Sequence, residues 1–352
     1  MEHFIRELQI NNFKSIKEVT LDCSRINLIV GKPNVGKSNI LEALSLFCAP
    51  FSRNKEQFLS EFIRYNQLEE LFFESEIQHP ISITSNLGEA VLISKKEIFQ
   101  LLSGQKGLFQ NYLKNDNFSF EAFNQEKLTT YDFLFSLYEL TANGTLVDEY
   151  KKKEIDYIKK YIFKKPSFSD LNGGVLMTPY GENLFSAVLT HSKLRQEIGE
   201  WLKEYRLDLV VDKRTKSLAV QKREGNIVYP ISYNLIADTL QRIIFYYTAI
   251  ESNKNSILLF EEPESHAFPP YIYELANKIR SDEKNNQYFI TTHSPYLFNS
   301  IIEKTPIEEV SVFLANYKDY QTTIKKLTKE ELQELLDYGI DIFFNAKYFT
   351  NG

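Results

Sequence analysis

Residues 31 to 38 read Gly31-Lys32-Pro33-Asn34-Val35-Gly36-Lys37-Ser38, which fits the pattern G-x-x-x-x-G-K-S of a phosphate-binding loop. An apolar run rich in β-branched residues, 25–30, precedes this stretch and predicts a buried strand. Residues 39–47 follow it with apolar side chains at helical spacing. A glycine-rich turn from a strand into a helix N-terminus points backbone N–H groups and the helix dipole at an anion. The sequence therefore predicts a site for nucleotide phosphates rather than a chance match to the pattern.

Two side chains of this loop have individual expected roles. Lys37 would reach the β- and γ-phosphates of ATP, and Ser38 would place its hydroxyl on Mg²⁺. The cofactors expected from the loop are thus ATP and Mg²⁺.

A pair of acids far downstream ends a second strand pattern. The apolar run 257–260 leads directly into Glu261 and Glu262. In open α/β sheets ligands gather at the carboxyl ends of strands, and neighbouring strand residues point to opposite faces. We therefore expect Glu261 to hold Mg²⁺ through its water shell and Glu262 to orient the attacking water. The alternative is a solvated strand end, where acids are common.

His293 follows a third apolar run, 288–292, and so lies at the same kind of strand end. Because of this position and the following Ser294-Pro295, we expect His293 to sense the γ-phosphate. A purely structural histidine is the alternative. His266 lies just beyond the acid pair and could border the site.

These motifs together resemble the ABC-type ATPases of the RecF, SMC and OLD (overcoming lysogenisation defect) group. The resemblance is carried by Ile10-Asn11-Asn12-Phe13-Lys14-Ser15-Ile16, by the phosphate loop with Leu41-Glu42-Ala43-Leu44, by Glu261-Glu262-Pro263-Glu264-Ser265-His266 with Phe268-Pro269, and by Thr291-Thr292-His293-Ser294-Pro295. It covers both ends of the chain well and the middle poorly. Glu261 stands where many ABC ATPases have aspartate, which resembles the OLD subgroup.

The resemblance implies further nucleotide contacts. Lys14, Ser15 and Asn39 would line the nucleotide, which such proteins hold between two head domains. A signature segment from the other subunit would cap the γ-phosphate, and residues 232–239 are the candidate, with Asp238 or Thr239 capping the following helix. This segment departs from the usual serine-glycine-glycine core. ABC-type ATPases usually also have a glutamine in a segment called the Q-loop. It is not assigned here; Gln67 and Gln78 are candidates.

Length and composition agree with an α/β head. The chain has 352 residues, of which 43% are apolar, so it can build a sizeable core. Its two cysteines have no metal-ligand spacing, and we find no signal peptide and no long apolar run. We expect a cytoplasmic protein without a membrane span.

We expect an ABC-type ATPase head with a mixed sheet, flanking helices and an antiparallel β layer. The expected segments are 1–94, an N-terminal lobe with the phosphate loop; 95–205, a mostly helical insertion; and 206–352, a C-terminal lobe with the acids and His293. Runs at 207–211 and 217–220 predict a hairpin, and Thr328 with Glu331 predicts a helix capping box. We find neither heptads for an SMC-like arm nor the residues for a Toprim nuclease domain.

A lysine-rich stretch, 151–165, is expected to be helical. A solvated helix face is its plainest interpretation, because the net charge of −6 favours no broad nucleic-acid surface. Contact with DNA or RNA, or with a protein partner, stays open.

The leading hypothesis is an OLD-like ATPase that works as a dimer or higher oligomer. By resemblance to ATPase subunits of bacterial anti-phage systems, it would sense infection and regulate a separate effector, such as a nuclease. A RecF-like DNA repair clamp and an ATP-locked scaffold with little turnover are the alternatives.

Overall fold

The computed structural model describes residues 4–96, 98–109, 134–165 and 171–350. The chain divides into two compact units, Met1–Lys159 with Glu308–Gly352 and Lys160–Ile307. We call them unit 1 and unit 2 and describe each by itself. The three-segment division expected from the sequence stays a prediction.

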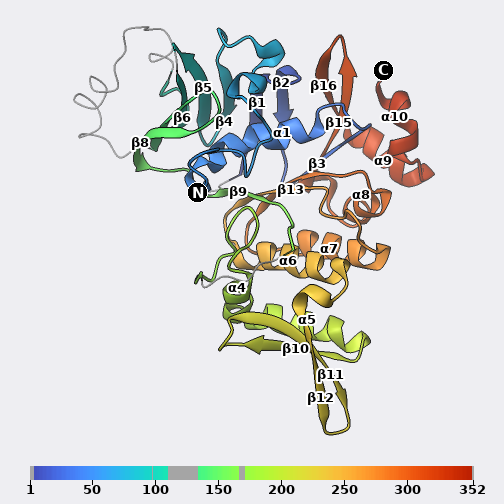
Figure 1. Ribbon diagram of the computed structural model, residues 1–352. Helices are drawn as coiled ribbons and strands as arrows, with labels where there is room; N and C mark the ends of the chain where they lie inside the picture. The colour runs from blue at the N-terminus through green and yellow to red at the C-terminus, as the bar shows by residue number, and fades with distance from the viewer. Residues whose placement is uncertain (1–3, 97, 110–133, 166–170, 351–352) are drawn as a thin grey trace. The chain divides into compact units, whose positions relative to one another are not determined.

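Unit 1 contains a seven-stranded antiparallel sheet, with the strand order β2-β1-β4-β5-β6-β7-β8 (Figure 1). Its strands are β1 (Glu7–Phe13), β2 (Ile16–Asp22), β4 (Ile81–Ser85), β5 (Glu89–Lys95), β6 (Ile98–Gly104), β7 (Phe135–Leu140) and β8 (Leu146–Lys153). β4 shows the alternating burial of a sheet with one covered face, whereas five successive residues of β5 are buried. This sheet is the expected antiparallel layer.

Unit 1 also carries the strands that hold the phosphate loop. β3 (Ile26–Gly31) pairs in parallel with β15 (Val310–Lys318), which pairs antiparallel with β16 (Gln321–Lys326). All six residues of β3 are buried, as expected for a parallel strand covered on both faces. The first and last parts of the chain therefore meet in one unit.

The helices of unit 1 are short. They are α1 (Lys37–Leu44), the 3₁₀ segments η1 (Ser45–Phe51), η2 (Leu68–Leu71) and η3 (Phe73–Ser75), α9 (Lys329–Tyr338) and α10 (Ile342–Thr350). The expected capping box is present at α9, where Thr328 and Glu331 each accept a hydrogen bond from the backbone N–H of the other.

Unit 2 is built of helices, a parallel strand pair and a small sheet. Its elements are α4 (Leu184–Thr190), α5 (Ser192–Glu204), β10 (Leu207–Asp212), β11 (Ser217–Glu224), β12 (Ile227–Ser232), η4 (Tyr233–Leu235), α6 (Asp238–Ser252), β13 (Ile257–Glu261), α7 (Pro269–Arg280), β14 (Gln287–Thr291) and α8 (Pro295–Ile302). β9 (Ile158–Tyr161) and η5 (Ile307–Glu309) lie at the borders of the units. β13 and β14 are parallel, and β10 with β11 forms the expected hairpin.

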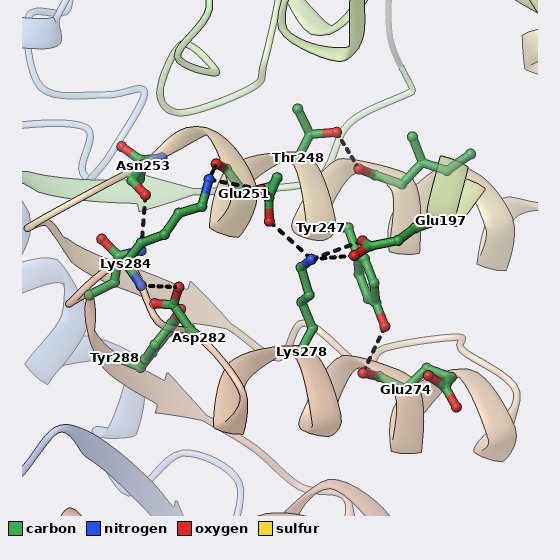
Figure 2. A network of polar contacts seen from close by, with 12 residues as sticks. Glu197, Tyr247, Thr248, Glu251, Asn253, Glu274, Lys278, Asp282, Lys284 and Tyr288 are labelled. Carbon is green, nitrogen blue, oxygen red and sulfur yellow. Dashed lines mark hydrogen bonds and ion pairs between the residues drawn. The ribbon is translucent and has the colours of Figure 1, made fainter. Parts of the chain in front are cut away.

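A chain of ion pairs joins three elements of unit 2 (Figure 2). The ammonium of Lys278 on α7 lies 2.8 Å from Glu197 on α5 and 3.0 Å from Glu251 on α6. Glu251 also lies 2.8 Å from Lys284. Lys278 and Glu251 each keep only 10% of their side-chain exposure, so these two charges depend on their partners for stabilisation.

The expected helical insertion, 95–205, is wrong for the described residues. β6, β7, β8 and β9 occupy much of its first part, and α4 and α5 are the only regular α-helices among the described residues of this segment. The basic stretch 151–165 accordingly contains the end of β8 and all of β9 rather than a helical face. β8 contains three lysines and two acids and is largely exposed, so its composition does not favour a strand, and pairing with β7 determines its conformation.

Candidate functional site

The phosphate loop has the strand–loop–helix context that the sequence predicts. β3 ends at Gly31, and α1 begins at Lys37 with Gly36 as its N-cap. Gly36 has a φ of 91° and Asn34 a φ of 60°, a backbone region that glycine and asparagine tolerate best. The first turn of α1 contains no acid and no side-chain cap, so its N–H groups and dipole favour an anion.

The glycines of the loop are required by close packing within unit 1. A Cβ on Gly36 would lie 2.0 Å from Oγ1 of Thr322, and a Cβ on Gly31 would lie 2.4 Å from the carbonyl oxygen of Ala315. Both approaches are shorter than a Cβ allows. The loop therefore fits against β15 and β16 only with glycine at these two positions.

A small polar cluster holds the loop from behind. Thr322 donates from Oγ1 to the carbonyl of Val35 at 3.0 Å, and this hydroxyl lies 2.6 Å from Oγ of Ser15. The side-chain amide of Asn39 donates to Ser15 Oγ at 2.8 Å. Ser15 and Asn39, expected to contact the nucleotide, thus lie beside the loop and support it. Thr322 carries no sequence signal, because its role arises from strand pairing far from the motif.

Lys37 lies along the loop, and its ammonium donates to the carbonyl of Lys32 at 2.7 Å. Lys37 is buried, whereas Lys32, Pro33 and Asn34 are exposed. Ser38, the expected magnesium ligand, is the second residue of α1.

The ammonium of Lys14 pairs with a buried carboxylate instead of facing open solvent. Its ammonium pairs with Glu42 and donates to the carbonyl of Arg64 at 2.6 Å. The guanidinium of Arg64 lies 2.7 Å from the other oxygen of Glu42, which is buried. These three residues link the end of β1 to α1, a structural role that the sequence pattern does not predict.

In unit 2 the register of two strands brings the acids and the histidine together. Glu261 pairs with Thr291 across the parallel strands β13 and β14, so Glu262 and His293 follow at the same edge. His293 Nε2 lies 3.3 Å from Oε1 of Glu262. Glu262 has a φ of 42° and donates its backbone N–H to the Thr291 carbonyl at 3.0 Å. A glutamate in this backbone region is uncommon, and such conformations are concentrated at functional sites.

Glu264 holds the histidine segment in place. It is buried, and its Oε1 accepts from the Thr292 hydroxyl and, at 3.2 Å, from the His293 backbone N–H. Burial raises the pKa of Glu264, although these hydrogen bonds oppose the shift. Glu264 belongs to the motif that begins with the acid pair, but the motif alone indicates no role for it.

Glu261 offers an observation about cation binding. Its Oε2 lies 3.3 Å from the ammonium of Lys160, so the carboxylate at the end of β13 already faces a positive charge. The described residues contain no group of three or more His, Cys, Asp or Glu side chains that could hold a metal by themselves. A single, partly exposed carboxylate at a strand end still fits Mg²⁺, because Mg²⁺ is bound by one or two protein carboxylates together with substrate phosphates.

The candidate signature segment leads into α6, but the expected cap is wrong. Ala237 is the N-cap and makes no side-chain hydrogen bond, so neither Asp238 nor Thr239 caps the helix. Thr239 instead donates to the carbonyl of His266 at 3.2 Å. Because the helix starts at Asp238, its N-cap is Ala237, whose side chain cannot accept a hydrogen bond.

An apolar groove of about 370 Å³ lies beside this helix start. Exposed Leu235 and Phe268 border it, with 76% and 62% of their surface accessible. Its other lining residues are Tyr205, Leu207, Ile231, Ile236, Ala237, Thr239, Leu240 and Tyr271.

Among the described residues, no helix is long and apolar enough to cross a membrane.

Comparison with solved structures shows which fold these units form. The head of an SMC protein, solved with the C-winged helix domain of ScpA, is similar with a TM-score of 0.52 and 14% identity, over 94% of this chain and 99% of that one. The SMC head of Pyrococcus furiosus, solved with an extended coiled coil and the C-terminal domain of ScpA, matches at a TM-score of 0.49 and 12% identity, over 95% and 99%. The first similarity confirms the expected ABC-type head fold.

A sequence relative covers less of the chain. The uncharacterized protein MJECL10 of Methanocaldococcus jannaschii is 50% identical over 44 residues, which are 12% of this chain and 20% of that protein. This match spans about a fifth of the relative's length and says nothing of the whole protein's activity.

A family comparison covers most of the sequence. The profile of the AAA ATPase domain family matches residues 4–218 and 232–298, which include the phosphate loop, the acid pair and His293. The match extends over well more than half of the chain and agrees with the expected enzyme class. The chain belongs to the AAA ATPase domain family and is an ATPase with the fold of an SMC head.

Proposed function

We propose that this ATPase hydrolyses ATP with Glu262 orienting the attacking water and His293 sensing the γ-phosphate. The 3.3 Å contact between Glu262 and His293 carries this proposal, because it places a carboxylate and an imidazole within reach of one reacting group. The phosphates would lie on the N–H groups of the loop 31–38 and on Lys37.

Ser38 and Glu261 are the proposed magnesium ligands. Mg²⁺, when bound, supplies positive charge to the β- and γ-phosphate oxygens. The chain's own contribution is then to orient the ligands. Glu264 supports this by fixing the backbone of His293 and the hydroxyl of Thr292.

The first experiment is single-turnover hydrolysis of ATP. We expect Glu262→Gln to bind ATP and to hydrolyse it about 100- to 10,000-fold more slowly, the range for loss of a general base. His293→Ala should impair turnover more than binding. Lys37→Ala is the control, since it should lose binding itself. Hydrolysis by Glu262→Gln at the wild-type rate would remove Glu262 from this role.

We further propose that ATP joins two or more copies of the chain, and that the assembly regulates a separate effector in anti-phage defence. The exposed Leu235 and Phe268 beside the candidate signature support association, because burying apolar side chains of this size in an interface is favourable. The effector, a nuclease by the resemblance given above, rests on that resemblance to OLD-like ATPases.

A pull-down of the Glu262→Gln protein with ATP from its native cells tests the effector. Recovery of a nuclease or another toxic protein in stoichiometric amount supports the defence role. Recovery of the ATPase alone favours the ATP-locked scaffold instead.

A RecF-like DNA clamp is a second candidate, favoured by the exposed lysines 151–153 of β8. Lys151 is partly neutralised, since it lies 3.1 Å from Glu149 and 3.4 Å from Glu154. Lysine on an edge strand also protects the edge against pairing with other chains. Duplex binding that weakens steeply with salt, and more so than in a triple Lys→Gln variant of these lysines, would favour the clamp.

A further inference from the structure

A buried lysine lies at the start of unit 2. Lys160, on β9, has only 1% of its side chain accessible to solvent. Its carbonyl accepts a hydrogen bond from Thr178, and the next residue, Tyr161, packs edge-on against Phe260 of β13 with 6.3 Å between ring centres. The backbone at Lys160 is therefore fixed on both sides, and its ammonium must be stabilised inside the protein.

The ammonium lies beside a carboxylate with an assigned role. Oε2 of Glu261 is 3.3 Å away, and Glu261 retains 22% of its side-chain exposure. Glu261 is the proposed magnesium ligand at the strand end. A protein ammonium and a divalent cation would thus act on the same carboxylate.

Two lysines that are largely but less completely buried serve differently. Lys278 joins Glu197 on α5 to Glu251 on α6, which links three helices of unit 2. Lys14 similarly links two elements through Glu42. Lys160 differs because its carboxylate partner is the partly exposed acid of a strand end at the candidate site.

We propose that Lys160 is a resident counter-cation of Glu261 that weakens divalent-cation binding by the nucleotide-free protein. The physical reason is repulsion: an ammonium beside the carboxylate acts on an incoming metal through an interior where charges are poorly screened. The negative charge of ATP offsets this repulsion, so the metal binds together with the nucleotide. The inference rests on the proposed role of Glu261 and makes Lys160 a positioning residue for metal loading.

The test measures Mn²⁺ binding to the nucleotide-free protein by electron paramagnetic resonance. Lys160→Met keeps the length of the side chain and removes its charge. We expect this variant to bind Mn²⁺ about tenfold more tightly than the wild type, which corresponds to about 1.4 kcal/mol. Lys278→Met is the matched control, because it removes a buried ammonium of the same unit away from Glu261, and it should bind Mn²⁺ as the wild type does. Unchanged or weaker Mn²⁺ binding by Lys160→Met overturns the proposal.

Two further variants separate this effect from a structural one. Lys160→Arg keeps the charge and should bind Mn²⁺ as the wild type does; binding as tight as that expected of Lys160→Met would contradict a charge effect. The double variant Lys160→Met/Glu261→Gln should lose the tenfold gain, and retention of the gain places the metal elsewhere. If Lys160→Met does not fold, Lys160→Gln removes the same charge with a polar side chain and should show the same gain in Mn²⁺ binding.

Failure of this inference and failure of the proposed function give different results. A wild-type protein that does not bind ATP with Mg²⁺ contradicts the proposed function, whatever the Mn²⁺ series shows. A protein that binds and hydrolyses ATP, but whose Mn²⁺ affinity is insensitive to residue 160, contradicts only the role of Lys160.

Discussion

Gly36 shows how much of the phosphate loop depends on one missing side chain. Its φ is 91°, and a Cβ at this position would lie 2.0 Å from the Thr322 hydroxyl, which leaves room for hydrogen alone. The same position is the N-cap of α1, so its backbone sets where the N–H groups point. The glycine thus serves packing and, under the proposed function, phosphate binding as well.

Gly36→Ala should lower the free energy of unfolding by about 2 to 5 kcal/mol, the sum of left-handed strain and overpacking. ATP binding should fall with it, because the loop must move away from Thr322. Gly199→Ala, within α5 and without close neighbours, is the control and should stabilise the protein by about 0.5 to 1 kcal/mol. Denaturant titration of the three proteins checks both signs; a Gly36→Ala protein as stable as the wild type contradicts the packing argument.

At this scale the sequence predicts residues whose role is local and misses those whose role is not. The glycines, Lys37 and the strand-end acids are recognisable because the proposed phosphate and metal sites require such residues at fixed spacing. Thr322 and Lys160 act through contacts with segments far away in the chain, so no spacing marks them.

The ion-pair chain of unit 2 acts between elements (Figure 2). Burial alone would raise the pKa of Glu251, but hydrogen bonds and charges from Lys284 and Lys278 outweigh it and hold that pKa below its usual value. A lowered pKa in the folded protein adds stability above the pKa of the unfolded chain, about 4.3 for glutamate. This stability is lost as the pH falls through the pKa of the folded state.

Glu251→Gln should therefore lower the free energy of unfolding at pH 7 by about 1 to 3 kcal/mol, because two lysines lose a charged partner. The difference from the wild type should shrink as the pH falls below about 4. Glu200→Gln, an exposed acid on α5, is the matched control and should change stability by less than about 0.5 kcal/mol. Denaturant titrations at several pH values measure all three; a difference that grows in acid contradicts the assigned sign.

Elements with a single strong pattern are predictable from sequence. β3, β13 and β14 are continuous apolar runs, and they form the expected buried strands. β8 is not predictable in this way, since its exposed lysines and acids leave no apolar face that would fix a period. The sequence also predicts the wrong N-cap for α6, because Ala237 has no polar side chain that would mark it as the cap.

On the scale of the whole molecule, nucleotide binding should control how many copies associate. We expect Glu262→Gln with ATP to elute as a dimer or larger assembly, and without ATP as a smaller species. Size-exclusion chromatography with light scattering checks this. Lys37→Ala/Glu262→Gln is the control and should stay small with ATP; equal masses with and without ATP would contradict nucleotide-controlled association.

The ATPase head was predictable as a whole because its motifs constrain a known arrangement of strands. The division of the chain into units was not, because β15 returns to β3 from the other end of the sequence. A local sequence pattern cannot predict pairing between strands that are so far apart in the chain.

This return of the chain has a consequence for synthesis on the ribosome. The phosphate loop emerges early, but the strands that pack against its glycines, β15 and β16, emerge only after unit 2 has been translated. A nascent chain that lacks them has the G-x-x-x-x-G-K-S motif without the Thr322 hydroxyl that holds Val35. Nucleotide competence should therefore arise only after β16 has been translated, which would keep a shorter nascent polypeptide from capturing ATP.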